Sequence, residues 1–291
     1  MQVHSFLHQS TETYTHVLVD LGQQLCAVID PVLGFDPKAG RTDTDHIDEV
    51  IAFIREHSWQ LVYIIETHAH ADHLSSAIHV KEVLGGQLVM GRHITEVQKI
   101  FKQIYNLDTS FRTDASQFDI LTDEGDRLTL GDITITAMHV PGHTPADMAY
   151  IAADDEKTVV FVGDTLFAPD VGTARCDFPG GDAKTLYQSI QKLLALDDDT
   201  VIYLCHDYPS EGRQHYPTST VAAQKLSNIH VKEGINEAEF VEMRERRDAT
   251  LQMPQLIIPA VQVNIDAGHF PKPEDNGIRY LKVPINVFGE S

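Results

Sequence analysis

The segment that most constrains this chain is a run of histidines and acidic residues directly after a short apolar stretch. Residues 61–66, Leu-Val-Tyr-Ile-Ile-Glu, indicate a buried strand. The next seven residues, Thr-His-Ala-His-Ala-Asp-His, contain His68, His70, Asp72 and His73. Alternate residues of an extended segment lie on the same side, so His68 and His70 can reach one metal ion. Asp72 and His73 project further on and suit a neighbouring metal, so the pattern predicts a metal site at the end of a strand.

Polar residues also stand just past other predicted strands. His143 lies in the rigid turn Pro-Gly-His-Thr-Pro, Asp164 follows residues 159–162, and His206 follows residues 201–204. Side chains at strand ends project into a shared cleft in sheet-based folds. We therefore expect these three residues to join the histidine cluster. Imidazole and carboxylate ligands together suit Fe, Zn or Mn, according to availability.

The hydrophobic pattern alternates between strand-like and helix-like segments, which indicates an α/β fold. Short apolar or β-branched runs predict strands at residues 13–19, 25–29, 61–66, 87–90, 159–162 and 201–204. The spacing of apolar residues predicts helices at residues 43–57, 74–84, 184–196 and 237–247. Residues 92–118 mix polar and apolar side chains, and we interpret them as a helical insertion.

The charge balance argues against nucleic acid as a partner. The 291 residues include 22 Lys and Arg but 43 Asp and Glu, which gives a net charge of −21 with histidine neutral. Nucleic-acid binders gain affinity from basic faces that neutralise phosphates. We expect the acidic surplus to serve solubility instead.

The sequence also predicts a cytoplasmic protein that does not contact a membrane. No apolar run approaches the ~18 residues that a membrane span needs, and residues 1–4 do not begin a secretory signal. The three cysteines, Cys26, Cys176 and Cys205, form no CxxC pair. We therefore expect neither a disulfide framework nor a zinc ribbon, and a reducing compartment fits better.

The ordered series of polar residues resembles the metallo-β-lactamase superfamily over about residues 10–210. The resemblance implies an α/β fold, a four-layer αββα sandwich with a metal cleft at the strand ends. All seven ligand positions of the dinuclear version are filled by suitable residues. In that version, the resemblance implies the following ligands: His68, His70 and His143 on one metal, Asp72, His73 and His206 on the other, and Asp164 as the bridge.

We expect residues 1–215 to form the catalytic domain, with the insertion at about 92–118 inside it. Residues 216–291 are expected to form a C-terminal extension that packs on this domain. The apolar segment 256–263 within the extension would suit a subunit interface, which makes a homodimer a candidate assembly.

Two branches of the superfamily share motifs with this chain. Residues 163–167, Gly-Asp-Thr-Leu-Phe, are similar to glyoxalase II. Residues 172–178, 186–190 and 206–208 resemble the persulfide dioxygenases, and that similarity extends to about residue 265. The chain departs from the second pattern at Cys176, where that family usually has Thr, and in the insertion and the tail.

The persulfide dioxygenase resemblance implies one Fe(II) per chain, held by His68, His143 and Asp164. Such a two-histidine, one-carboxylate triad leaves three positions open for substrate and oxygen. The implied reaction is oxidation of glutathione persulfide by O₂ and water to sulfite and glutathione, with Asp72 as a further catalytic residue. The four remaining polar residues would then surround the iron without binding it, and orient its ligands and the substrate.

Three alternatives remain open at the level of sequence. A glyoxalase II-like hydrolase of glutathione thiolesters would use two metals, such as zinc, to activate a bridging water. A lactonase would use the same site, with the 92–118 segment as a lid and Phe101, Ile104, Tyr105 and Leu107 facing the cleft. The non-enzyme alternative is a metal-binding or redox-sensing module.

Glutathione carries carboxylates, so an acidic chain needs local cations to bind it. Arg175 lies shortly after the strand that leads to Asp164, and its guanidinium can bind a carboxylate through two hydrogen bonds. Tyr208 and Arg213 follow His206 and are the other candidate substrate-binding residues.

Overall fold

The computed structural model describes residues 1–288, which form two six-stranded sheets and one three-stranded sheet. The first large sheet has the order β1 (Gln2–His8), β2 (Thr13–Asp20), β3 (Leu25–Ile29), β6 (Gln60–Ile65), β8 (Gln87–Gly91), β9 (Ile120–Thr122). The second has the order β10 (Arg127–Leu130), β11 (Ile133–His139), β12 (Met148–Ala153), β13 (Thr158–Phe161), β14 (Val201–Tyr203), β15 (Thr218–Thr220). The small sheet contains β5 (Arg41–Asp43), β4 (Val32–Asp36) and β7 (Leu74–Ser75).

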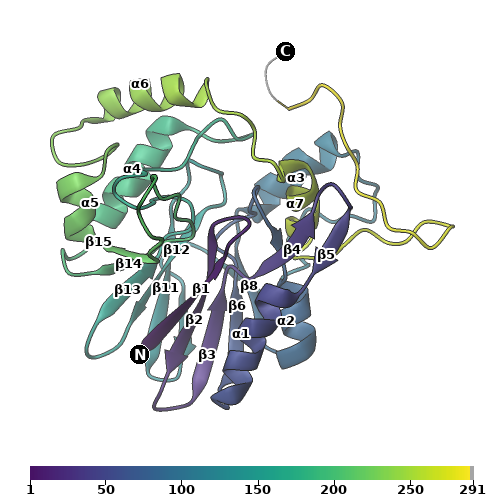
Figure 1. Ribbon diagram of the computed structural model, residues 1–291, viewed down its shortest axis with the longest axis horizontal. Coiled ribbons are helices and arrows are strands. Elements are labelled where there is room, and N and C mark those ends of the chain that lie inside the picture. Colours follow the sequence, from purple (N-terminus) through teal and green to yellow (C-terminus); the bar gives the residue numbers. More distant parts are fainter. Residues whose placement is uncertain (289–291) are drawn as a thin grey trace.

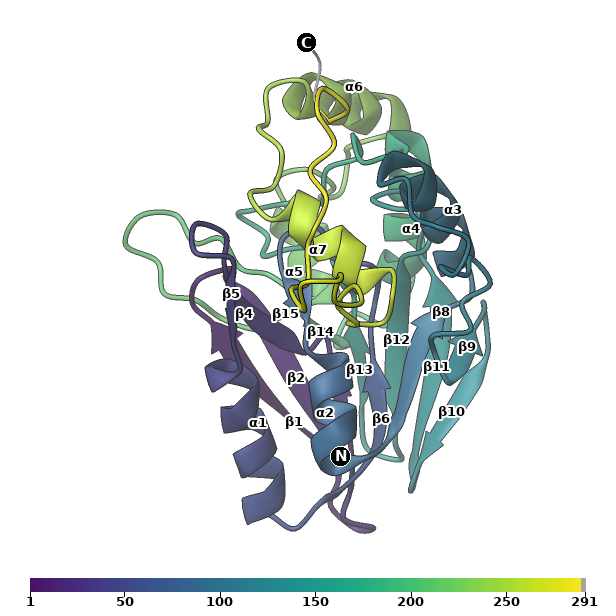
Figure 2. The ribbon, with the colours of Figure 1, turned by 90° about the vertical axis from the view of Figure 1, so that its right-hand side faces the viewer.

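Helices cover the outer face of each large sheet (Figures 1 and 2). The first sheet packs against α1 (Asp45–Glu56), α2 (Ala77–Leu84), α3 (Ile94–Ile104) and α7 (Ile257–Asn264). The second packs against α4 (Ala183–Leu194), α5 (Val221–Ser227) and α6 (Glu237–Asp248). The expected four-layer α/β sandwich is therefore confirmed.

Alternation along the central strands explains why both faces of each sheet are buried. In β2, Val17 and Val19 pack towards the helices, whereas Leu18 packs into the core between the two sheets. In β3, Val28 likewise packs towards the helices and Ile29 packs between the two sheets. Successive side chains of a strand point to opposite faces, so a continuous apolar run suits a strand covered on both sides.

The strand directions bring the polar loops to one edge. Strands β3, β6 and β8 are parallel neighbours, as are β13 and β14. Their carboxyl ends therefore meet, and the loops after β6, β13 and β14 carry His68, Asp164 and His206. The loop between β11 and β12 brings His143 to the same edge.

Residues 92–118 do not form the lid that the lactonase alternative would require. Helix α3 begins in this segment, and its Phe101 and Tyr105 are buried in the core beside α7, while Ile104 and Leu107 pack at the edge of that core. The apolar stripe of an amphipathic helix is most stable against other apolar surface. None of these four side chains lines the large cavity described below.

The tail is packed more closely on the rest of the chain than a free extension would be. Residues 256–263 form most of α7, whose Val261 and Val263 are fully buried within the chain, whereas Ile258 and Pro259 are partly buried. Strand β15 pairs with β14, so the second sheet extends past residue 215, and the extension starts only after Thr220. Its helix α6 packs on α4.

The remaining sequence expectations concern cysteines and membranes. Cys26, Cys176 and Cys205 are buried and form no disulfide. Across residues 1–288, the structure contains no helix with the length and apolar character that crossing a bilayer requires.

His16 links the two sheets and gives folding a pH dependence. Its Nε2 donates to the carbonyl of Leu204, 2.9 Å away, and its Nδ1 lies 2.9 Å from the hydroxyl of Ser5. Burial lowers the pKa of His16 to about 4, although the Leu204 carbonyl and Asp30 favour the charged form. The unfolded chain protonates this ring near its ordinary pKa, so stability falls as the pH drops from about 6.5 to about 4.

We expect His16→Gln to reduce this sensitivity. Between pH 7.5 and pH 5.0, the free energy of unfolding of the wild type should fall by about 2 kcal/mol more than that of the variant. Urea unfolding of the metal-free protein at both pH values measures the difference. Equal losses in the two proteins would show that His16 is not held neutral in the fold.

Candidate metal centre

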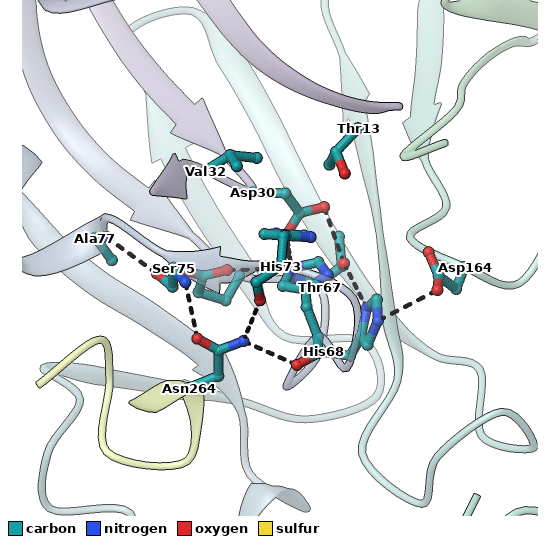
Figure 3. Close-up of polar contacts among 12 residues, drawn as sticks. Thr13, Asp30, Val32, Thr67, His68, His73, Ser75, Ala77, Asp164 and Asn264 are labelled. Atoms are coloured by element: carbon teal, nitrogen blue, oxygen red, sulfur yellow. Dashed lines mark hydrogen bonds and ion pairs between the residues drawn. The ribbon is translucent and has the colours of Figure 1, made fainter. Parts of the chain in front are cut away.

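Two histidines and one aspartate form the first group of the site. His68 Nε2 and His143 Nε2 lie 3.7 Å and 3.6 Å from Asp164 Oδ2, and Figure 3 shows the first of these pairs. One ligand atom of each residue lies within 4.8 Å of the other two. The structure thus brings together two imidazoles and one carboxylate from three separate loops.

The second group contains the other four polar residues, His70, Asp72, His73 and His206. His206 Nε2 lies 3.1 Å from Asp72 Oδ2 and 3.2 Å from Asp164 Oδ1. His73 Nδ1 lies 3.4 Å from Asp72 Oδ1. Asp164 therefore stands between the two groups, as a bridging carboxylate would.

His70 lies between the two groups. Its ring centroid is 4.0 Å from that of His68 and 4.1 Å from that of His73. Its Nε2 lies 3.1 Å from Asp30 and 3.2 Å from Glu66, two buried carboxylates that hold the ring. Burial alone would lower the pKa of His70, but these carboxylates raise it well above its ordinary value.

Sequence reasoning missed Asp30 and Glu66, although the signal was present. Asp30 directly follows β3 and Glu66 directly follows β6, so both obey the strand-end pattern that identified the other residues. Asp30 also accepts hydrogen bonds from the backbone and the hydroxyl of Thr67, at 2.8 Å and 2.9 Å.

Hydrogen bonds orient the imidazoles so that one nitrogen remains for a metal. The Nδ1 atoms of three rings bond to oxygen: His68 to Thr67 Oγ1 (3.0 Å), His143 to the Arg175 carbonyl (2.8 Å) and His206 to Thr13 Oγ1 (3.1 Å). A carbonyl only accepts, so His143 Nδ1 carries the proton and its Nε2 is the lone-pair nitrogen. Partners of this kind fix the tautomer and the ring orientation of metal-binding histidines.

The polar atoms that face the centre fit a metal ion. Buried polar atoms in proteins almost always have a hydrogen-bond partner, yet several atoms here make no hydrogen bond and have at most the ion-pair contacts given above: His68 Nε2, His70 Nδ1, His73 Nδ1 and Nε2, Asp72 Oδ2, Asp164 Oδ1 and His206 Nε2. They are imidazole nitrogens and carboxylate oxygens, which are the donors that Fe, Zn and Mn accept. The residues of the site therefore fit the metal that the sequence predicts.

The electrostatics of the site favour positive charge. Burial would raise the pKa of Asp164, but His206 and His68 hold it well below its ordinary value. Burial would likewise lower the pKa of His206, but Asp72 and Asp164 raise it to about 9. The buried carboxylates therefore demand a compensating cation, which is either a proton on an imidazole or a bound metal.

A cavity of about 1030 Å³ opens onto this centre, with Asp72, His143 and Asp164 among its lining residues. Phe167 and Tyr208 also line it, and the Tyr208 ring stacks on His206 with centroids 5.4 Å apart. The volume is at the upper end of the range typical of small-molecule sites.

The structure alters two of the three predicted substrate contacts. Tyr208 and Arg175 line the cavity, but the Arg175 guanidinium already bonds both carboxylate oxygens of Asp177 and the Gln252 carbonyl. Arg213 does not line the cavity and binds Asp207 in its own loop and Asp170 in the loop that follows β13.

A different cation, Arg247, lies on the cavity wall. It comes from the last turn of α6, and the structure gives it no ion pair with any residue in the range 1–288. Sequence reasoning missed it because residues 244–247, Arg-Glu-Arg-Arg, read only as a charged helical stretch.

Gly163 offers a test of how the first group is held. A Cβ at this position would lie 2.7 Å from Thr67 Oγ1, the atom that orients His68. We expect Gly163→Ala to displace Thr67 and weaken metal binding about 10-fold or more. Gly125→Ala is a matched control, because Gly125 also has a positive φ but open space around it. Metal titration of both variants measures the effect, and equal affinities would contradict this account.

Comparisons with known proteins place the chain in a family. A family model described as the metallo-beta-lactamase superfamily matches residues 14–206. The chain is 50% identical over 293 residues to a probable metallo-hydrolase of Burkholderia pseudomallei strain 1710b, covering 99% of this chain and all of that protein. It is 45% identical over 286 residues to Glyoxylase B2 of Dictyostelium discoideum, covering 98% and 97% of the two chains.

More distant relatives include a dioxygenase. The chain is 29% identical over 257 residues to the mitochondrial persulfide dioxygenase ETHE1 of Mus musculus, covering 88% of this chain and 84% of that protein. The crystal structure of ETHE1 from Myxococcus xanthus superposes with a TM-score of 0.73 at 27% identity, covering 92% of this chain and all of that one. The sandwich, the metal-binding residues and these matches together show that the chain belongs to the metallo-β-lactamase superfamily.

Proposed function

We propose that this protein is a persulfide dioxygenase that oxidises glutathione persulfide with O₂ and water to sulfite and glutathione. The observation that carries the proposal is that His68, His143 and Asp164 offer two imidazoles and one carboxylate within 4.8 Å of one another. Two histidines and one carboxylate with open positions are typical of non-haem Fe(II) oxygenases. One Fe(II) per chain is therefore the proposed cofactor.

Two further observations support the proposal. Residues 172–178 resemble the persulfide dioxygenases, and the similarity to the mouse persulfide dioxygenase covers most of the chain.

The three buried, unbridged cysteines suit a reducing compartment such as the cytoplasm.

The chain's own residues would arrange the reactants. When bound, Fe(II) would supply the redox chemistry that couples a persulfide to dioxygen. Thr67 and the Arg175 carbonyl fix the rings of His68 and His143, which would hold the iron together with Asp164 at the edge of the cavity. Tyr208 and Phe167 cover the centre with aromatic surface, which limits the access of water to the reacting sulfur.

A dinuclear hydrolase of glutathione thiolesters is the second candidate. It is favoured by the complete second group and by Asp164, which lies within reach of both groups. The similarity to Dictyostelium Glyoxylase B2 points the same way. In that case two metals, such as zinc, would activate a bridging water.

Metal content and oxygen uptake distinguish the two candidates. We expect anaerobically purified protein reloaded with Fe(II) to bind about one iron per chain, because the first group offers a complete triad. Glutathione persulfide should then trigger rapid uptake at an oxygen electrode, with sulfite as product. If the protein instead binds two metals tightly, hydrolyses S-lactoylglutathione and takes up no oxygen, the dioxygenase proposal is wrong and the hydrolase is supported.

Two buried histidines of the centre form a matched pair for this experiment. We expect His143→Ala to abolish iron binding, whereas His73→Ala should keep about one iron per chain because it lies outside the triad. Loss of iron in both variants would contradict a mononuclear site.

Arg247 is the expected contact for a glutathione carboxylate, because the other two arginines that line the cavity are already paired, Arg175 with Asp177 and Arg244 with Asp248. Loss of a charge-assisted hydrogen bond should raise the KM for glutathione persulfide about 10-fold in Arg247→Ala, with little change in kcat. The control is Arg246→Ala, an exposed neighbour that does not line the cavity. Equal KM values for the two variants would exclude Arg247 from substrate binding.

A further inference from the structure

A side chain from the C-terminal helix reaches the metal-binding loop. Asn264, the last residue of α7, is 3% exposed, and Figure 3 shows it below the loop. Its Nδ2 donates to the carbonyls of His70 and His73, each at 2.8 Å, and its Oδ1 accepts from the backbone N–H of Ser75, also at 2.8 Å. The amide group therefore makes all three of its hydrogen bonds with the backbone of residues 70–75.

The loop depends on this contact because little else holds its backbone. Within the described chain, no backbone-to-backbone hydrogen bond involves residues 68–73. The backbone hydrogen bonds of the neighbourhood begin on either side, where Thr67 accepts from Met148 and Ser76 donates to Pro31. The Asn264 amide thus supplies hydrogen bonds that fix the segment carrying four of the seven metal-facing side chains.

Helix α7 is itself firmly anchored. Ala260 and Val263 pack with Leu74, at the far end of the loop. On the other side, Gln98 of α3 donates to the Ile265 carbonyl at 2.9 Å. Helix α3 lies in the 92–118 segment, so this segment supports the helix that holds the metal loop.

We propose that Asn264 is a positioning residue of the metal centre, which fixes the loop that carries His68 as well as His70, Asp72 and His73 by binding the His70 and His73 carbonyls. The inference rests on metal binding at this centre and is independent of which reaction the centre performs. Asn264 and α7 lie outside residues 14–206, the part that the superfamily shares. The extension of this chain therefore contributes directly to the geometry of the site.

A neighbouring amide on the same helix provides the matched control. Gln262 is 5% exposed, and its side chain bonds the backbone N–H and carbonyl of Lys282, each at 2.8 Å. It also donates to the Ile258 carbonyl and makes no hydrogen bond to the metal loop. Asn264→Ala and Gln262→Ala each remove a buried amide from α7, but only the first releases the loop.

The experiment measures metal affinity, without an activity assay. Full-length protein is stripped with a chelator and titrated with Co(II) against a chromophoric competitor. We expect Asn264→Ala to weaken Co(II) binding about 10- to 100-fold, as loss of a supporting contact typically does. Gln262→Ala should stay within about two-fold of the wild type. EDTA should remove the metal faster from Asn264→Ala than from Gln262→Ala or the wild type.

Three results would overturn the proposal or its basis. If Asn264→Ala binds Co(II) within about two-fold of the wild type, the residue does not position the metal centre. If Gln262→Ala weakens Co(II) binding equally, the effect of Asn264 is only structural. If Asn264→Ala does not fold, Asn264→Ser, which keeps a single hydroxyl, is held to the same threshold. A wild type that binds no Co(II) would instead contradict the metal centre and the proposed function together.

Discussion

The structure depends on carboxylates that are buried beside imidazoles at one edge of a sandwich. Asp30 and Glu66 are removed from water, Asp72 and Asp164 are largely shielded from it, and an isolated buried carboxylate is very costly. The cost is offset only if imidazoles, hydrogen-bond donors and a cation are held at fixed places. Two sheets with helices on both outer faces provide that rigidity, because the strand ends that carry these residues are themselves buried.

Much of this arrangement could be predicted from the sequence, because it depends on patterns within short segments of the chain. A strand that is buried on both faces is visible as an apolar run, and the residue after it is fixed in space by the strand. That reasoning found the seven metal-facing residues and most of the helices. The same argument, applied to Asp30 and Glu66, would have found the carboxylates behind His70.

What could not be predicted depends on contacts between distant parts of the chain. Arg175 is occupied partly by the Gln252 carbonyl, 77 residues away, and the His70 ring is turned by Asp30, 40 residues away. The packing of the tail could not be predicted for a related reason. An apolar helix looks the same in the sequence whether it packs inside the chain or against another subunit, and only the fold shows that α7 is internal.

The contact between Asn264 and the loop also bears on the order of events during synthesis. The two partners are separated by 194 residues, and the helix lies near the end of the chain. Chains are made from the N-terminus and fold as segments emerge. The loop with His70 and His73 is therefore made 194 residues before Asn264 and lacks this support until α7 has emerged. Metal loading in the mature geometry consequently follows the synthesis of α7.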